Sequence, residues 1–329
     1  MNYRKLGSSG LLVSELSLGS WITFGAQIEN DTSKQLLHYA YDSGVNFFDN
    51  AETYAKGRSE EVMGHILADS GWTRDTYIIS SKAYFGAVDN PRPNQTGLSR
   101  KHLVEACHAA LRRLRLDYLD LYYCHRPDAS VPMFEIVRTM NDLVAQGKVL
   151  YWGTSEWPAD LIIAAHECAE RHHLIPPVME QPQYSLVVRD RVEREYAPLY
   201  SRYGMGTTTW SPLAAGLLSG KYTDGIPADS RLAQTTWLRA LMEGQSANGI
   251  PGTALKAFAP IARVAAAAGL PPARFAIAWC LRNPKVSTVI LGASRVEQLT
   301  ENLLAAGDVA KLTPDVLAAV DQATAGLHA

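Results

Sequence analysis

Short apolar segments alternate with amphipathic segments along nearly the whole chain, and this rhythm limits the folds open to it. The apolar segments are rich in β-branched and aromatic residues, which is typical of buried strands. They are residues 12–18, 45–49, 77–82, 118–124, 149–154, 178–181, 206–210 and 286–291. The amphipathic segments, which predict helices, are residues 33–43, 59–68, 100–114, 133–146, 159–171, 189–203, 254–268, 272–282 and 294–305. Continuously apolar strands that alternate with helices predict a parallel sheet covered by helices.

Eight strand–helix units favour closure into a (β/α)8 barrel, a TIM barrel, over an open doubly wound sheet. We expect residues 1–329 to form one barrel domain, since the chain is 47% hydrophobic and 19% charged and can bury a large core. The opening residues 3–12 predict a small β-hairpin that closes the bottom of the barrel. Residues 221–252, after the seventh strand, are too long for an ordinary connection, and we expect them to form a clamp or lid.

Composition argues against several classes of partner. The net charge is −2, and no lysine or arginine cluster is present that would predict nucleic-acid binding. The four cysteines are far apart in the sequence, so that no zinc or redox motif is indicated and we expect reduced thiols. No apolar run approaches the length of a membrane span, and the first residues do not resemble a signal peptide. We therefore expect a cytoplasmic protein without a membrane or nucleic-acid partner.

Four polar residues stand where a barrel would bring them together. Asp49, Lys82 and His125 each end an apolar strand segment, and Tyr54 follows Asp49 in the next loop. Barrel enzymes carry their sites at the carboxyl ends of the strands, and neighbouring strands lie about 4.8 Å apart. The sequence therefore predicts that these four side chains meet at one mouth of the barrel.

The chemistry of this set is that of a proton donor to oxygen. A buried Lys82 needs the Asp49 carboxylate beside it, and the ammonium is expected to lower the pKa of the Tyr54 phenol. His125 can donate a hydrogen bond that orients and polarises a carbonyl oxygen. Because the set holds no electron source, we expect a bound cofactor to supply hydride. A glycosidase would need two opposed carboxylates, and a metal site would need clustered ligands, for which the sequence gives no pattern.

The pattern Asp49-x₄-Tyr54 with Lys82 and His125 resembles the catalytic tetrad of the aldo-keto reductases. The resemblance extends along the chain and is greatest to the branch with the β subunits of voltage-gated potassium channels and their bacterial relatives. The segments that carry it are residues 19–25, 97–102, 126–128, 210–222 and 278–283. It implies a barrel that binds NADPH without a Rossmann domain, in agreement with the absence of a G-x-G-x-x-G motif between a predicted strand and helix.

The resemblance implies reduction of aldehydes or ketones to alcohols with NADPH, which becomes NADP+. Tyr54 would be the general acid, Lys82 and Asp49 would tune it, and His125 would position the substrate. The implied cofactor contacts are Ser20, Trp21, Gln27, Asp49, Ser155, Gln181, Trp210, Ser211, Pro212, Leu213, Ala214, Gly216, Ser219, Lys221, Arg231, Gly292, Ser294, Gln298, Glu301 and Asn302.

The resemblance also implies which part of the cofactor each of these residues contacts. Ser155 and Gln181 would hold the nicotinamide amide, and Trp210 would pack beside it. The segment from Ser211 to Lys221 would line the pyrophosphate, and Arg231 would reach across from the long loop. Residues 294–302 would hold the adenosine 2′-phosphate and the adenine, as helix N-termini commonly bind phosphate.

Two departures from the family pattern bear on function. Ala293 and Gln298 stand where many members carry lysine and arginine, which weakens the prediction of NADPH over NADH, and Arg295 is a possible substitute. His125 stands where the channel subunits have asparagine, which favours a working reductase. The alternative is a regulatory or redox-sensing cofactor-binding protein like those subunits, and the branch often forms tetramers or octamers.

Aromatic residues close to the predicted site suggest a substrate pocket. Trp21, Tyr84, Phe85 and Trp157 follow predicted strands, where their rings would wall the pocket. Such walls favour aromatic or apolar aldehydes as the small carbonyl substrate.

Overall fold

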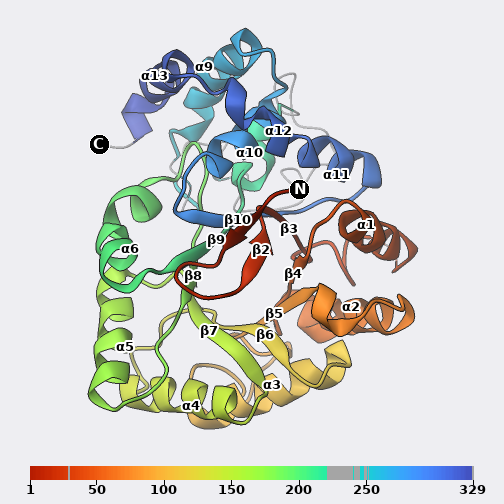
Figure 1. The fold of residues 1–329 in the computed structure, drawn as a ribbon, viewed down its shortest axis with the longest axis vertical. Helices are drawn as coiled ribbons and strands as arrows, with labels where there is room; N and C mark the ends of the chain where they lie inside the picture. Colours follow the sequence, from red (N-terminus) through yellow and green to blue (C-terminus); the bar gives the residue numbers. More distant parts are fainter. Residues whose placement is uncertain (29, 221–239, 241–244, 248–249, 251, 328–329) are drawn as a thin grey trace.

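The computed structural model describes residues 1–28, 30–220, 240, 245–247, 250 and 252–327. Its centre is a closed barrel of eight parallel strands, so that the prediction of a TIM barrel is confirmed (Figure 1). In order around the barrel the strands are β3 (Leu16–Gly19), β4 (Phe47–Asp49), β5 (Ile78–Ala83), β6 (Leu119–Cys124), β7 (Val149–Ser155), β8 (Met179–Gln181), β9 (Gly206–Trp210) and β10 (Val286–Leu291). Strand β10 pairs with β3, which closes the barrel without free sheet edges.

Helices surround the barrel on its outside, as Figure 1 shows. They are α1 (Asn30–Asp42), α2 (Arg58–Asp69), α3 (Arg100–Leu114), α4 (Met133–Ala145), α5 (Ala159–Arg171), α6 (Ala197–Tyr203), α9 (Ala254–Ala267), α10 (Pro272–Leu281), α11 (Val296–Leu303), α12 (Ala305–Asp308) and α13 (Pro314–Thr324). The side chain of Ser99 accepts a hydrogen bond from the backbone N–H of His102 and so caps the start of α3.

A two-stranded hairpin closes the amino-terminal mouth of the barrel. Strands β1 (Tyr3–Lys5) and β2 (Leu12–Ser14) pair in antiparallel fashion, and Figure 1 shows them across the barrel opening. Leu6 and Val13 of the hairpin region are fully buried and pack against residues of the barrel interior, among them Phe47. The hairpin therefore fills the bottom of the barrel with apolar side chains and leaves the opposite mouth for polar ones.

Two sequence predictions about elements are wrong in detail. Residues 12–18 form two strands and not one, because the chain turns at Glu15, whose buried carboxylate accepts hydrogen bonds from Asn2 and Arg4. The helix predicted at 189–203 is a π-helical turn (Arg191–Glu195) followed by α6. Pro198 lies in the first turn of α6, and since proline has no N–H it cannot continue a helix from the preceding turn.

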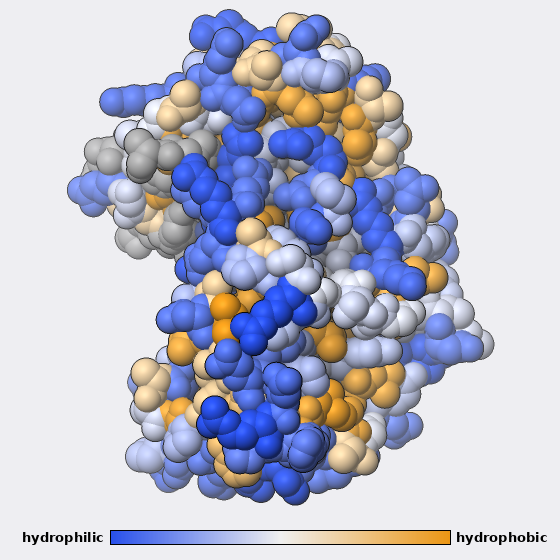
Figure 2. Space-filling view, turned by 60° about the vertical axis from the view of Figure 1, so that its left-hand side comes forward, coloured by the Kyte–Doolittle hydropathy of each residue, from blue (hydrophilic) through white to orange (hydrophobic). Residues whose placement is uncertain are grey.

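The packing has an inner and an outer layer. The inner layer lies inside the barrel, near the hairpin, and includes Phe47, Leu121 and Tyr123. The outer layer is larger, lies between the strands and the helices, and includes Phe48 and Tyr122. This alternation along each strand is the period of two that places Asp49 and Lys82 on the inner side. Figure 2 shows one face of the exterior, where small hydrophobic groups are interspersed among hydrophilic residues.

Two further observations concern composition. Cys107, Cys124, Cys168 and Cys280 are all free thiols. Among the described residues no single helix is both long and apolar enough to cross a membrane, although residues 256–267 and 272–281 together, bent by 87°, have the required length and composition.

Candidate active site

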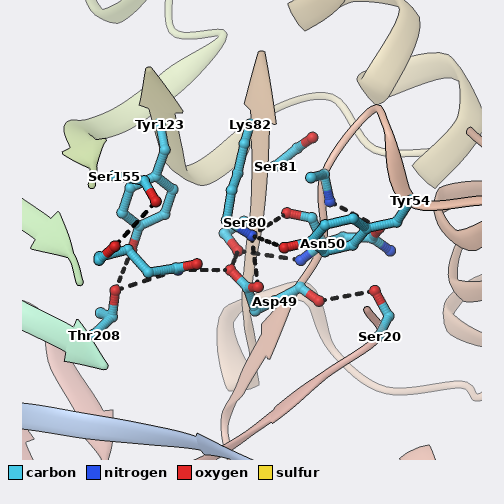
Figure 3. A network of polar contacts seen from close by, with 12 residues as sticks. Ser20, Asp49, Asn50, Tyr54, Ser80, Ser81, Lys82, Tyr123, Ser155 and Thr208 are labelled. Carbon is cyan, nitrogen blue, oxygen red and sulfur yellow. Dashed lines mark hydrogen bonds and ion pairs between the residues drawn. The ribbon is translucent and has the colours of Figure 1, made fainter. Parts of the chain in front are cut away.

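Four side chains converge at the carboxyl-terminal mouth of the barrel. Asp49 ends β4, Lys82 lies near the end of β5, and His125 directly follows β6. Tyr54 begins a short 3-10 helix (Tyr54–Gly57) in the loop after β4, where the backbone of Ala55 and Lys56 takes positive φ values. Such left-handed backbone is costly for residues other than glycine and is typical of functional loops. Figure 3 shows the convergence of Asp49, Tyr54 and Lys82.

The ammonium of Lys82 is fully buried, and three acceptors surround it. Nζ lies 2.6 Å from Oδ2 of Asp49, 2.7 Å from the carbonyl oxygen of Asn50 and 3.1 Å from the hydroxyl oxygen of Tyr54. An ammonium has three N–H donors and no acceptor, so that all three are used. The Tyr54 oxygen therefore accepts a hydrogen bond from Lys82. Its own O–H can donate to another group, such as a bound ligand.

The carboxylate of Asp49 is held from its other side. Its Oδ1 accepts hydrogen bonds from Oγ of Ser80 at 2.7 Å and from Nε2 of Gln181 at 3.0 Å. The same Gln181 amide nitrogen lies 3.4 Å from Oγ1 of Thr208, which in turn contacts the Tyr123 hydroxyl at 3.0 Å. Buried carboxylates persist only when they are paired and hydrogen-bonded, and this network from β5, β8 and β9 meets that requirement (Figure 3).

The acidity of Tyr54 differs from the sequence-based expectation. Burial raises the pKa of Tyr54 well above its ordinary value, and the negative charge of Asp49 raises it further, whereas Arg126 lowers it. The expectation that Lys82 lowers this pKa is therefore wrong for the structure as it stands. The carboxylate of Asp49 balances the charge of the Lys82 ammonium. Burial lowers the pKa of Lys82, whereas Asp49 raises it. Tyr54 consequently keeps its proton at neutral pH, as a proton donor must.

His125 is a neutral imidazole in this site. Burial lowers its pKa well below the ordinary value, and the charges of Lys82 and Arg126 act in the same direction. Its ring packs edge-on against Tyr54, with 6.0 Å between ring centroids, and against Phe85 at 5.2 Å. The buried Nδ1 has no hydrogen-bond partner among the described residues. A neutral imidazole carries one N–H donor, which suits it to orient a carbonyl oxygen.

A cavity of about 1070 Å³ extends from this mouth across the ends of β9 and β10. Tyr54 and His125 line one part of it, and Ser294 and Asn302 line the other. Its volume is at the upper end of the range of ligand pockets, which is large enough for an extended cofactor together with a small substrate.

Most of the residues expected to contact a cofactor line this cavity. They are Trp21, Gln27, Asp49, Ser155, Gln181, Trp210, Ser211, Pro212, Leu213, Gly216, Ser219, Gly292, Ser294, Gln298, Glu301 and Asn302. Ser20 and Ala214 are instead fully buried and do not belong to the cavity wall. Ser20 donates its hydroxyl to the backbone oxygen of Asp49 and so supports the site from behind. Lys221 and Arg231, with most of the predicted clamp, lie outside the described residues.

The polar groups of the cavity fit a dinucleotide. Nε2 of Gln181 is used by Asp49 and Thr208, which leaves its carbonyl oxygen as an acceptor for an amide N–H. After β9 the backbone of Ser211, Ala214, Ala215 and Gly216 takes positive φ values. Such alternation of backbone conformation forms concavities that bind anions. At the far end the buried Nδ2 of Asn302 has no partner among the described residues.

Comparison with known proteins assigns the family. The sequence profile described as Aldo/keto reductase family matches residues 15–325. The chain belongs to this family.

The relatives of this aldo/keto reductase include proteins named after ion channels. It is 48% identical over 304 residues to a probable voltage-gated potassium channel subunit beta of Oryza sativa subsp. japonica, and 47% identical over 304 residues to one of Arabidopsis thaliana. Each alignment covers 92% of this chain and 90% of the relative. A putative voltage-gated potassium channel subunit beta of Schizosaccharomyces pombe is 48% identical over 302 residues, which cover 92% of this chain and 87% of the relative.

The aromatic residues predicted to wall the substrate pocket of this aldo/keto reductase differ in position. Trp21 and Phe85 line the cavity and are 36% and 41% exposed, and Trp21 packs edge-on against Trp210. Tyr84 packs edge-on against Phe85, with 4.9 Å between the ring centroids, and does not line the cavity. The prediction for Trp157 is wrong, because its side chain is 1% exposed and packs in the core between strands and helices. Its backbone is held there by Glu180, which accepts its N–H at 3.3 Å, and by Tyr196, which donates to its carbonyl oxygen at 2.7 Å.

Sequence reasoning missed the supports beneath this site. One carboxylate oxygen of Glu52 accepts the backbone N–H groups of Tyr84 and Gly86, each at 2.8 Å, and lies 3.1 Å from Nε2 of His102. It thereby holds the loop that carries Phe85. The only sequence signal is that Glu52 lies between Asp49 and Tyr54, and a surface loop residue would look the same.

A second carboxylate holds the Trp210 indole. One carboxylate oxygen of Glu156 accepts hydrogen bonds from Nε1 of Trp210 at 2.9 Å and from the backbone N–H of Gln183 at 2.6 Å. Its other oxygen pairs with Arg191 at 2.6 Å. Both oxygens of Glu156 are therefore occupied by protein groups.

A metal centre is not indicated in the part of the chain that the structure describes. There, no group of three or more histidine, cysteine, aspartate or glutamate side chains is arranged to hold a metal ion.

Proposed function

We propose that this aldo/keto reductase reduces aldehydes or ketones to alcohols with NADPH and uses Tyr54 as the general acid. The observation that supports this most strongly is the 3.1 Å contact from Nζ of Lys82 to the Tyr54 oxygen, because it leaves the phenolic proton directed away from Lys82. Both Tyr54 and His125 line the same cavity, so that one carbonyl oxygen can face the two donors.

Each residue has a distinct task in this proposal. His125 donates its N–H to the carbonyl oxygen and orients it, and Tyr54 gives the proton that the oxygen needs as it gains negative charge. Asp49 keeps Lys82 charged in a buried place, and the ammonium then stabilises the phenolate that remains. The reduced nicotinamide, when bound, supplies the hydride.

The proposal can be tested with purified protein, a panel of aldehydes and ketones, and both reduced nicotinamides. Loss of nicotinamide absorbance that depends on the carbonyl compound and on Tyr54 supports it. Binding of NADPH without turnover of any carbonyl in the panel would contradict it. The far end of the cavity carries Arg295 and no lysine at position 293, so the comparison of NADPH with NADH also measures how strongly the chain selects the phosphate.

A regulatory role is the second candidate, and the names of the relatives favour it. In that case the chain would bind the cofactor as a redox sensor and act on a channel-like partner. Single-turnover rates distinguish the two roles, because a sensor can release or oxidise its cofactor slowly and an enzyme has to turn over. We favour the enzyme, since His125 supplies a hydrogen-bond donor at the place where a carbonyl oxygen is expected.

Two further parts of the proposal concern its setting. We place the protein in the cytoplasm, with a small carbonyl compound as its substrate. We also propose a homo-oligomer, a tetramer or octamer, which sedimentation of the purified protein would test.

A further inference from the structure

Arg126 is a charged residue of the cavity that the proposed mechanism does not use. It directly follows His125 and lines the same part of the cavity as Tyr54 and Phe85. Its Nη1 donates to the backbone oxygen of His125 at 2.5 Å, and its guanidinium lies over the Phe85 ring, 5.5 Å from the ring centroid. These two contacts hold the side chain in place while its other N–H groups stay available.

The charge of Arg126 is not neutralised by a neighbour in the described chain. Lys82, which also lies beside the reacting groups, is paired with Asp49, whereas the described residues offer Arg126 no ion pair. Asp128, two residues on, uses its carboxylate for the backbone N–H of Leu98 and for Ser130. A buried ion pair contributes no net charge, so Arg126 gives this end of the cavity a charge of about +1.

The field of Arg126 reaches the reacting groups. It lowers the pKa of Tyr54, of Lys82 and of His125, although Lys82 and His125 are themselves nearly fully buried. His125 is neutral and Lys82 is paired with Asp49, so that within the described part of this site no second unpaired positive charge competes for an anion. The phosphate-binding features of the cavity lie elsewhere, beyond β9 and β10, and leave Arg126 on the side of the substrate.

We infer that Arg126 selects carbonyl substrates that carry a carboxylate or another oxyanion group, a specificity that rests on the proposed reductase function. Guanidinium groups bind carboxylates through paired N–H donors, which fixes the orientation of the substrate. The aldehyde would lie at Tyr54 and His125 while the anion meets Arg126. The exposed rings of Trp21 and Phe85 would cover the apolar body between them.

The test compares two aldehydes of the same shape, para-formylbenzoate and para-formylbenzamide, in the wild type and in Arg126→Met. Loss of Arg126 slows both aldehydes to some degree, because the pKa of Tyr54 rises without it. We expect the ratio of the two kcat/KM values, acid over amide, to fall by about 10- to 100-fold. Arg126→Lys should recover part of the ratio, since it restores the charge without the paired donors. Arg138→Met, an exposed arginine on α4, is the matched control and should leave the ratio unchanged.

Binding gives a second readout that does not need turnover. With NADP+ bound, neither aldehyde can be reduced, and quenching of Trp21 and Trp210 fluorescence reports their dissociation constants. The wild type should bind the acid at least about 10-fold more tightly than the amide, and Arg126→Met should abolish this difference. Equal binding of the two compounds by the wild type, or an unchanged ratio in Arg126→Met, overturns the assignment of Arg126. Absence of turnover with a binding preference retained would instead remove the reductase function alone.

Discussion

The Lys82 ammonium donates to the Tyr54 hydroxyl across 3.1 Å, while the same nitrogen lies 2.6 Å from Asp49. The phenol oxygen therefore accepts a hydrogen bond from a buried ion pair, and the phenolic O–H can donate to another partner. This relationship leads to two predictions about catalysis.

Tyr54→Phe removes the proton donor and keeps the ring. We expect carbonyl reduction to fall by about 10²- to 10⁴-fold, with little change in the dissociation constant of NADPH measured by fluorescence quenching. Tyr84→Phe, which also removes a phenol near the cavity, serves as the control and should keep its activity. Turnover by Tyr54→Phe close to that of the wild type would exclude Tyr54 as the acid.

Lys82→Met should abolish activity and also destabilise the protein, since it leaves Asp49 buried without its cation. Breaking a buried ion pair from one side costs about 3–5 kcal/mol of unfolding free energy. The double variant Lys82→Met/Asp49→Asn should regain most of that stability in urea denaturation and none of the activity. Recovery of activity in the double variant would mean that the charge of Lys82 has no catalytic role.

Glu52→Ala should loosen the loop that carries Phe85. The backbone N–H groups of the half-buried Tyr84 and of the buried Gly86 lose their acceptor, and an unsatisfied buried group costs about 1–3 kcal/mol. We expect the KM of an aromatic aldehyde to rise by about tenfold while NADPH binding changes little. Glu61→Ala, at an exposed position of α2, is the control. An equal loss of aldehyde and NADPH binding would argue for a general loss of structure.

His166 should make the protein less stable in acid. Burial lowers its pKa from 6.5 to about 4, with a further contribution from Arg202, and its ring stacks on Tyr203 at 4.0 Å. Because the folded pKa is lower than the unfolded one, the unfolded chain takes up the proton first as pH falls. The contribution of His166 is thus fully present above pH 6.5 and is lost as pH falls toward about 4.

The unfolding free energy that is lost through protonation of His166 is on the order of 3 kcal/mol. Contact of the ring with solvent reduces this loss. Urea denaturation of the wild type and of His166→Gln at a series of pH values measures it. We expect the variant to lose less stability across this interval. Parallel curves for the two proteins would show that His166 does not titrate in this way.

Gly64→Ala should strongly destabilise the contact between α2 and α3. A Cβ at this position would lie 2.2 Å from the backbone oxygen of Arg113 and 2.7 Å from Cα of Leu114, so the helices would have to separate. Overpacking of this kind costs about 1–3 kcal/mol or more. Gly307→Ala has no described atom within 4 Å of the new Cβ and should change the melting temperature little. Similar melting temperatures for both variants would contradict the close approach of the helices.

The barrel and most of the site could be predicted from the sequence, because both depend on local patterns. The alternation of apolar strands with amphipathic helices, with Asp49, Lys82 and His125 at strand ends, is enough to predict a closed sheet with these groups at one mouth. The prediction from this pattern is wrong at Glu15, where one apolar segment forms two strands. It is also wrong at Trp157, a loop residue whose side chain is buried in the core.

The electrostatics of the site could not be predicted in the same way. The pKa of Tyr54 depends on burial and on the nearby charges of Asp49 and Arg126, and both are properties of the packed structure. The same holds for Arg126, whose sequence neighbours do not reveal that it lines the cavity and has no ion pair with any residue that the structure describes.

By itself the sequence determined which residues lie on the inner side of the barrel and at which end, because strand periodicity and chain direction are local properties. Only the tertiary structure decided which of these groups are charged, paired or free, because desolvation and Coulomb energies depend on distances between atoms that are far apart in the chain.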